Sequence, residues 1–168
     1  MKIISVILLI TILSSCWPKS VSFVDGSMPD EWETFYVETV TSLSPNAPIS
    51  YPASLSESIK DGIQNKTRLL LNTSSENSEL YISGEVLSYT ITPLALQEGD
   101  NAAKNRMTIN ASFKIDIRKP EVDQMTLNSS KFVDYDSNTD LASVENSLLE
   151  EINEQIVQDV INKLLSNW

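Results

Sequence analysis

The chain has 168 residues, no histidine, a single cysteine and a formal net charge of −11. Such an acidic chain is poorly suited to nucleic acid, because phosphate binding requires clustered lysine and arginine. The absence of histidine and the single cysteine exclude Ser-His-Asp and Cys-His nucleophile pairs, and most zinc or copper sites. Its four glycines, at positions 26, 62, 84 and 99, form no phosphate-binding loop.

Residues 1–15 have the pattern of a secretory signal peptide. One positive charge, Lys2, precedes an apolar run at residues 3–13 that is too short to cross a bilayer permanently. The run ends in Leu13-Ser14-Ser15-Cys16, which resembles a bacterial lipobox. It predicts cleavage before Cys16 and a covalent lipid on the Cys16 sulfur, with acyl chains such as palmitate, and no other cofactor. The alternative is an ordinary secreted protein with a stray cysteine.

Residues 16–33 contain two prolines and a glycine and show little periodicity. They predict a lipidated tether, with a short strand at residues 21–24. The folded domain is predicted to start at residue 34, because residues 34–40 are rich in β-branched and aromatic side chains and indicate a strand. Three prolines within residues 44–52 predict a loop.

A helix is predicted from Ser54 to about Asn65, because apolar residues recur at a spacing of four. These residues are Leu55, Ile59 and Ile63. Ser54 and Glu57 have the spacing of a capping box at the start of this helix. A second strand at residues 67–71 and a polar turn at residues 72–78 follow.

Residues 79–92 predict a long strand with a bulge between Gly84 and Leu87, where the apolar alternation changes phase. Pro93 ends this pattern, and residues 94–105 read as a connection. The clearest alternation follows at residues 107–117, where every second residue is apolar and the others are polar, as in a strand with one buried face. After Pro120, residues 125–135 indicate a further strand.

The last predicted element is a helix at residues 144–165. Its apolar residues form an unbroken row at a spacing of four: Leu148, Ile152, Ile156, Val160 and Leu164. The outward positions are mainly acidic. Packing on a sheet is therefore favoured over a membrane-surface helix, which usually carries lysine and arginine.

Together these elements predict an α+β fold, with a small, mostly antiparallel sheet of about four to five strands and two helices on one face. Residues 34–168 form one domain, and the opposite sheet face is polar. Two carboxylate pairs, Asp134/Asp136 and Glu150/Glu151, leave a glycan hydrolase as a formal alternative. Solvated surface is the favoured interpretation of both pairs, because an acidic protein contains such pairs by chance.

Several segments, taken in order, resemble one protein family. They are Asn46-Ala47-Pro48, residues 65–71, residues 80–86 followed by Tyr89, residues 102–109 with the sequence AAKNRMTI, and the terminal Asn167-Trp168. In this order, after a lipoprotein signal, they are similar to the lipopolysaccharide (LPS)-assembly lipoproteins, the LptE-like proteins. The resemblance covers nearly the whole processed chain.

The resemblance implies an outer-membrane lipoprotein on the periplasmic side, without enzymatic activity, that plugs an LptD-type β-barrel and assists LPS assembly. Lys104 and Arg106 are the candidate LPS contacts, since the ligand is polyanionic. Thr108, Asn110 and Ser112 are the candidate barrel contacts, because a barrel lumen is polar. The competing hypothesis is a free periplasmic lipid-handling or pilotin-like chaperone lipoprotein.

Overall fold

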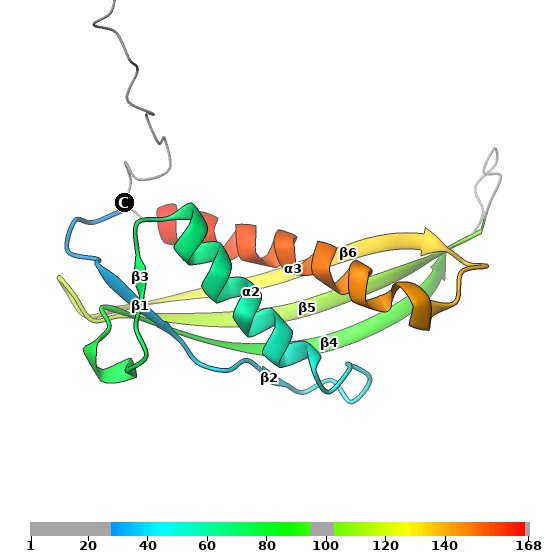
Figure 1. The fold of residues 1–168 in the computed structure, drawn as a ribbon, viewed down its shortest axis with the longest axis horizontal. Helices are drawn as coiled ribbons and strands as arrows, with labels where there is room; N and C mark the ends of the chain where they lie inside the picture. The colour runs from blue at the N-terminus through cyan, green and yellow to red at the C-terminus, as the bar shows by residue number, and fades with distance from the viewer. Residues whose placement is uncertain (1–27, 95–102, 167–168) are drawn as a thin grey trace, which may run out of the picture.

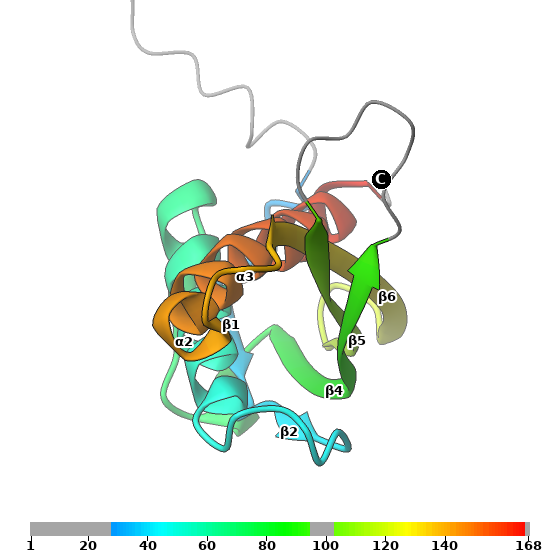
Figure 2. The same cartoon turned by 90° about the vertical axis from the view of Figure 1, so that its right-hand side faces the viewer.

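The computed structural model describes residues 28–94 and 103–166. Two long helices lie side by side over one face of a six-stranded sheet, and no described element covers the other face (Figure 1; Figure 2). The predicted α+β class is therefore confirmed, with six strands in place of four to five. The predicted signal peptide, Cys16, the strand at residues 21–24 and the terminal Asn167-Trp168 lie outside the described residues.

The sheet has the strand order β3-β1-β4-β5-β6, and β2 also pairs with β4. The strands are β1 (Thr34–Val37), β2 (Thr41–Ser42), β3 (Leu70–Leu71), β4 (Leu80–Leu94), β5 (Lys104–Ile117) and β6 (Asp123–Asp136). The helices are α2 (Tyr51–Lys66) and α3 (Leu141–Leu165), with a short 3₁₀ turn, η1 (Ser75–Asn77). No helix within the described ranges is both long and apolar enough to cross a membrane.

The sheet is mixed: the expected antiparallel pairing holds for its long strands, and the short strands add parallel pairs that were not expected. Strands β4, β5 and β6 form a long antiparallel meander. The short strands β1 and β2 run parallel to β4, and β3 runs parallel to β1. The connection from β1 to β3 passes through α2, and such a crossover returns the chain in the same direction. The antiparallel meander still supplies most of the paired residues.

The strand predicted at residues 34–40 is interrupted between β1 and β2. The break occurs where the backbone N–H of Val40 donates to the Ser56 hydroxyl on α2, at 2.8 Å. Val40 is buried at this point, so its side chain joins the core under the helix. The backbone then returns to the sheet, where the Leu43 N–H donates to the carbonyl oxygen of Val86 at 2.9 Å.

Helix α2 begins at Tyr51, earlier than predicted, and the capping box is wrong. Pro52 lies in the first turn, where a missing N–H costs no helical hydrogen bond. Ser54 is already inside the helix, and its N–H donates to the Ser50 carbonyl oxygen at 3.1 Å. Glu57 instead pairs with Lys60 at 2.8 Å.

The bulge predicted in the long strand is confirmed at Leu87. Val86 pairs with Ala111 and Ser88 with Asn110, so the intervening Leu87 has no partner on β5. The extra residue shifts the buried side chains from even-numbered positions before it, such as Val86, to odd-numbered positions after it, such as Tyr89. Pro93 does not end β4, which continues to Leu94.

The alternation predicted at residues 107–117 is confirmed residue by residue. All six odd-numbered side chains are buried against the helices: Met107, Ile109, Ala111, Phe113, Ile115 and Ile117. The residues between them point to the opposite face of β5. One face of this strand therefore belongs to the core, and the other is available for interactions.

The core extends into the segment predicted as a tether. Met28 and Trp32 are both buried, and Trp32 has no exposed surface. The Trp32 indole Nε1 donates to the carbonyl oxygen of Lys119, just after β5, at 2.8 Å. Two main-chain carbonyls, those of Met28 and Pro29, accept hydrogen bonds from Arg68. Packing therefore begins before the predicted domain start at residue 34.

Gly84 lies where β4 leaves no room for a side chain. A Cβ atom there would stand 2.6 Å from Cδ1 of Phe113 and 3.2 Å from Cγ2 of Val40. We expect Gly84→Ala to lower the free energy of unfolding by about 1–3 kcal/mol, because the Phe113 ring must move within a packed core. Urea denaturation measures this change, with Ser83→Ala on the open side as the control. An unchanged midpoint for Gly84→Ala contradicts the packing described here.

Candidate functional site

The uncovered side of the sheet is a candidate interaction surface, and we call it the open face. It consists of the even-numbered side chains of β5 and of the residues opposite them on β4 and β6. On β5 these residues are Lys104, Arg106, Thr108, Asn110, Ser112, Lys114 and Asp116. The predicted LPS and barrel contacts therefore share one surface, with the lysine and arginine near one end.

Thr108, Asn110 and Ser112 occupy the middle of the open face and are half-buried among neighbouring strands. The Asn110 amide nitrogen donates to the Ser88 hydroxyl on β4 at 2.7 Å. Thr108 lies opposite Thr90 in the register. Short polar side chains thus make this area shallow and rich in hydrogen-bonding groups.

Arg106 is held by an acidic neighbour on the next strand. Its Nε lies 2.6 Å from Oδ1 of Asp134, and the terminal NH2 lies 2.8 Å from Oδ2. The guanidinium also lies over the Phe132 ring, 3.7 Å from its centroid. This pairing lowers the pKa of Asp134 and raises that of Arg106. A phosphate at Arg106 would compete with Asp134, whereas Lys104 is exposed and forms no ion pair among the described residues.

An aromatic pair marks the opposite end of the open face. The rings of Tyr36 and Tyr81 stack with centroids 5.7 Å apart, and the Arg118 guanidinium lies 5.5 Å from the Tyr81 ring centroid. The Tyr81 hydroxyl donates to a Glu38 carboxylate oxygen at 2.7 Å. This hydrogen bond, with burial and the negative charge of Glu38, raises the pKa of Tyr81 to about 12. The phenol is therefore a neutral donor at physiological pH.

A hollow of about 350 Å³ opens beside the break between β1 and β2. Its lining includes Glu38, Glu85 and Lys114, together with the predicted contact Ser112. Because Ser112 belongs to the open face, the hollow is a depression within that face.

The two carboxylate pairs do not form a common site. Asp134 is engaged by Arg106, and Asp136 accepts a hydrogen bond from the Asn138 N–H at 2.8 Å. Glu150 and Glu151 lie on α3, in the helix layer. Within the described ranges, no three side chains of His, Cys, Asp or Glu come together to hold a metal ion.

Sequence reasoning missed buried polar residues on the helix side of the sheet, among them Asn153 and Ser129. Asn153 of α3 is 2% exposed and Ser129 of β6 is 3% exposed. The Ser129 hydroxyl donates to Asp159 at 2.7 Å, and Lys131 pairs with Asp159 at 2.8 Å. Asn153 could have been found, because it interrupts an apolar spacing of four between Leu149 and Val157.

These features define a class of protein: a small α+β domain whose two helices cover one sheet face and leave a polar face open. Residues 32–164 match the family model described as "LptE: Lipopolysaccharide-assembly". The chain belongs to the LptE family of lipopolysaccharide-assembly proteins. Among curated protein sequences, none matches this chain.

Several solved structures share the fold at low sequence identity. An uncharacterized lipoprotein B from Nitrosomonas europaea is 13% identical, with a TM-score of 0.53, covering 90% of this chain and 91% of that one. The hypothetical protein CT253 from Chlamydia trachomatis is also 13% identical, with a TM-score of 0.53, covering 81% and 99%. Protein XCC0632 from Xanthomonas campestris is 13% identical, with a TM-score of 0.52, covering 83% and 87%. At these identities the likeness concerns the fold alone.

Proposed function

We propose that this protein is an outer-membrane lipoprotein that plugs an LptD-type β-barrel and assists it in placing LPS at the cell surface. The open face is the observation that carries the proposal. It presents hydroxyl, amide and charged groups along β5, as expected of a surface that fits a polar barrel lumen. Membership of the LptE family supports the same role, which requires no catalysis.

The barrel contact centres on Thr108, Asn110 and Ser112 in this proposal. Copurification through a tag on the full chain, in mild detergent, tests it. Recovery of an LptD-type barrel supports the plug. Its absence overturns the plug and favours a free periplasmic lipid-handling or pilotin-like chaperone lipoprotein.

Substitution of Asn110 by arginine is expected to reduce the recovered barrel at least tenfold. The bulky cation would replace a short amide in the middle of the shallow surface and break its bond to Ser88. Ser147→Arg provides the matched control, because Ser147 is exposed on α3 in the helix layer. Equal recovery with both variants would contradict a contact through the open face.

The proposal places a lipid on Cys16 and the LPS contact at Lys104 and Arg106. Mass spectrometry of the processed protein is expected to show Cys16 at the amino terminus with a diacylglycerol and acyl chains, as multiple chains are needed for stable anchoring. An unmodified Cys16 would contradict the proposed lipoprotein.

Unchanged LPS binding by the double variant Lys104→Gln/Arg106→Gln would show that these two residues do not contact LPS.

A further inference from the structure

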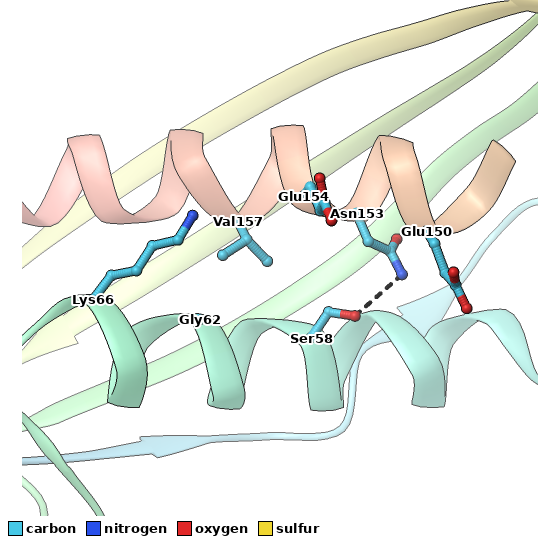
Figure 3. Close-up of a pocket in the computed structure, with 7 residues that line it drawn as sticks. All are labelled: Ser58, Gly62, Lys66, Glu150, Asn153, Glu154 and Val157. Carbon is cyan, nitrogen blue, oxygen red and sulfur yellow. Dashed lines mark hydrogen bonds between the residues drawn. The ribbon is translucent and has the colours of Figure 1, made fainter. Parts of the chain in front are cut away.

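A groove of about 460 Å³ runs between α2 and α3 on the helix layer (Figure 3). Helix α2 contributes Ser58, Gly62 and Lys66 to its lining. The helices approach closely at Gly62, where a Cβ atom would lie 2.2 Å from Cγ1 of Val157. The absence of a side chain at Gly62 thus permits the close packing that shapes the groove.

Asn153 in this groove is buried without full hydrogen bonding. Its side-chain nitrogen donates to the Ser58 hydroxyl oxygen at 3.3 Å, and the residue is 2% exposed. Its Oδ1 atom is buried and has no donor among the described residues. Ser58 cannot provide one, because its own hydroxyl donates to the Ser54 carbonyl oxygen at 3.0 Å. A buried acceptor without a donor is costly and rare.

Two carboxylates flank Asn153 on the same side of α3. Glu150 and Glu154 lie three residues before and one residue after it, and both are exposed. Neither forms an ion pair with another described residue. The cation of the groove, Lys66, donates to Oε1 of Gln158 at 3.2 Å, toward the other end. The end near Glu150 therefore combines two carboxylates with a buried amide oxygen that has no donor.

We propose that this groove binds an organic cation that carries several N–H donors, a guanidinium or an alkylammonium group. Such a group would form charge-assisted hydrogen bonds with Glu150 and Glu154. It would also place an N–H donor at the opening of the groove, next to Asn153. An anion would be repelled by the two carboxylates at this end. The site lies in the helix layer, away from the open face, so it does not depend on the proposed function.

Side-chain amide NMR of the full chain, purified in a neutral detergent, tests the site. The probes are spermidine, a free polyamine, and a blocked Gly-Arg-Gly peptide, which presents one arginine side chain. We expect saturable shifts of the Asn153 amide with a dissociation constant on the order of 1 mM, as exposed ion pairs are weak. Glu150→Gln/Glu154→Gln should weaken binding at least tenfold, and Glu151→Gln, one residue along α3, should leave it unchanged.

The two probes separate the possible sources of the cation. Saturation by the peptide supports a site for an arginine or lysine side chain of a partner, and saturation by spermidine alone supports a free polyamine site. Lys66→Gln should tighten binding of either probe about twofold, because it removes a like charge from the groove. The absence of saturable shifts with both probes, or equal shifts in the double variant, would overturn the proposal.

Discussion

Replacement of Trp32 by alanine is expected to lower the free energy of unfolding by about 3–5 kcal/mol, the range typical of large buried aromatic residues. Trp32 has no exposed surface and is the largest of the fully buried side chains. Its indole also connects the start of the domain to the end of β5, through the bond to the Lys119 carbonyl. Loss of the ring leaves a cavity and an unpaired backbone acceptor. Urea or guanidinium denaturation of the full chain measures the effect.

Trp32→Phe separates packing from hydrogen bonding. It retains a buried ring but removes Nε1, so a smaller loss of about 1–2 kcal/mol is expected from the missing hydrogen bond. Substitution of the neighbouring, exposed Glu31 by alanine controls for general effects in this segment. A Trp32→Ala variant as stable as the Glu31→Ala control would show that residues 28–33 are a tether, as the sequence first indicated.

Glu79 is expected to make the protein lose stability in acid. Its carboxylate is nearly buried at the start of β4, and burial alone would raise its pKa. The hydrogen bonds from Thr34 and Lys119 outweigh burial and lower the pKa of Glu79 from 4.5 to about 2. These donors include the Thr34 N–H at 2.8 Å and the Lys119 Nζ at 3.1 Å.

Because the folded-state pKa is depressed, the stabilisation is complete above the unfolded pKa of about 4.5 and is lost as the pH falls toward 2. The loss amounts to roughly 3 kcal/mol, because each unit of difference between the two pKa values corresponds to about 1.36 kcal/mol. Denaturation curves between pH 7 and pH 2 measure it. Glu79→Gln should lower the free energy of unfolding at pH 7 and make it less dependent on pH between 4.5 and 2. Glu76→Gln, which changes a nearby exposed carboxylate, should do neither. If the stability of Glu79→Gln falls with acid as steeply as that of the parent protein, Glu79 is not the group responsible.

The strands and helices that are buried on one side along their whole length could be predicted from the sequence. Strand β5 is covered on one side along its whole length, so its alternation survives in every residue from Met107 to Ile117. Helix α3 packs along one stripe, which the spacing of Leu148, Ile152 and Ile156 indicates directly. The polar character of the open face followed from the same alternation, because the side chains between the apolar ones must point outward.

Features that depend on contacts distant in sequence could not be predicted in the same way. Apolar periodicity contains no information on strand direction, so the parallel pairing of β1 with β4 was missed. The break after β1 occurs at a hydrogen bond to the Ser56 hydroxyl on α2. Trp32 is hydrogen-bonded to the carbonyl of Lys119, 87 residues away in the sequence. The unsatisfied oxygen of Asn153 becomes evident only when its neighbours in space are known.

The hydrogen bond from Trp32 to Lys119 places the start of the described chain at the end of the sheet that holds the β5–β6 turn. With the proposed lipid on Cys16, the chain from Cys16 to Met28 can reach about 40 Å at full extension. Such a lipid would keep the sheet end that holds the β5–β6 turn within about this distance of the bilayer. Strand β5 spans roughly 45 Å, at about 3.3 Å per residue. Arg106 and Lys104 lie at its other end, away from the β5–β6 turn. Under the proposed anchoring, the β5–β6 end of the open face is the end tethered to the membrane, about one strand length from Lys104 and Arg106.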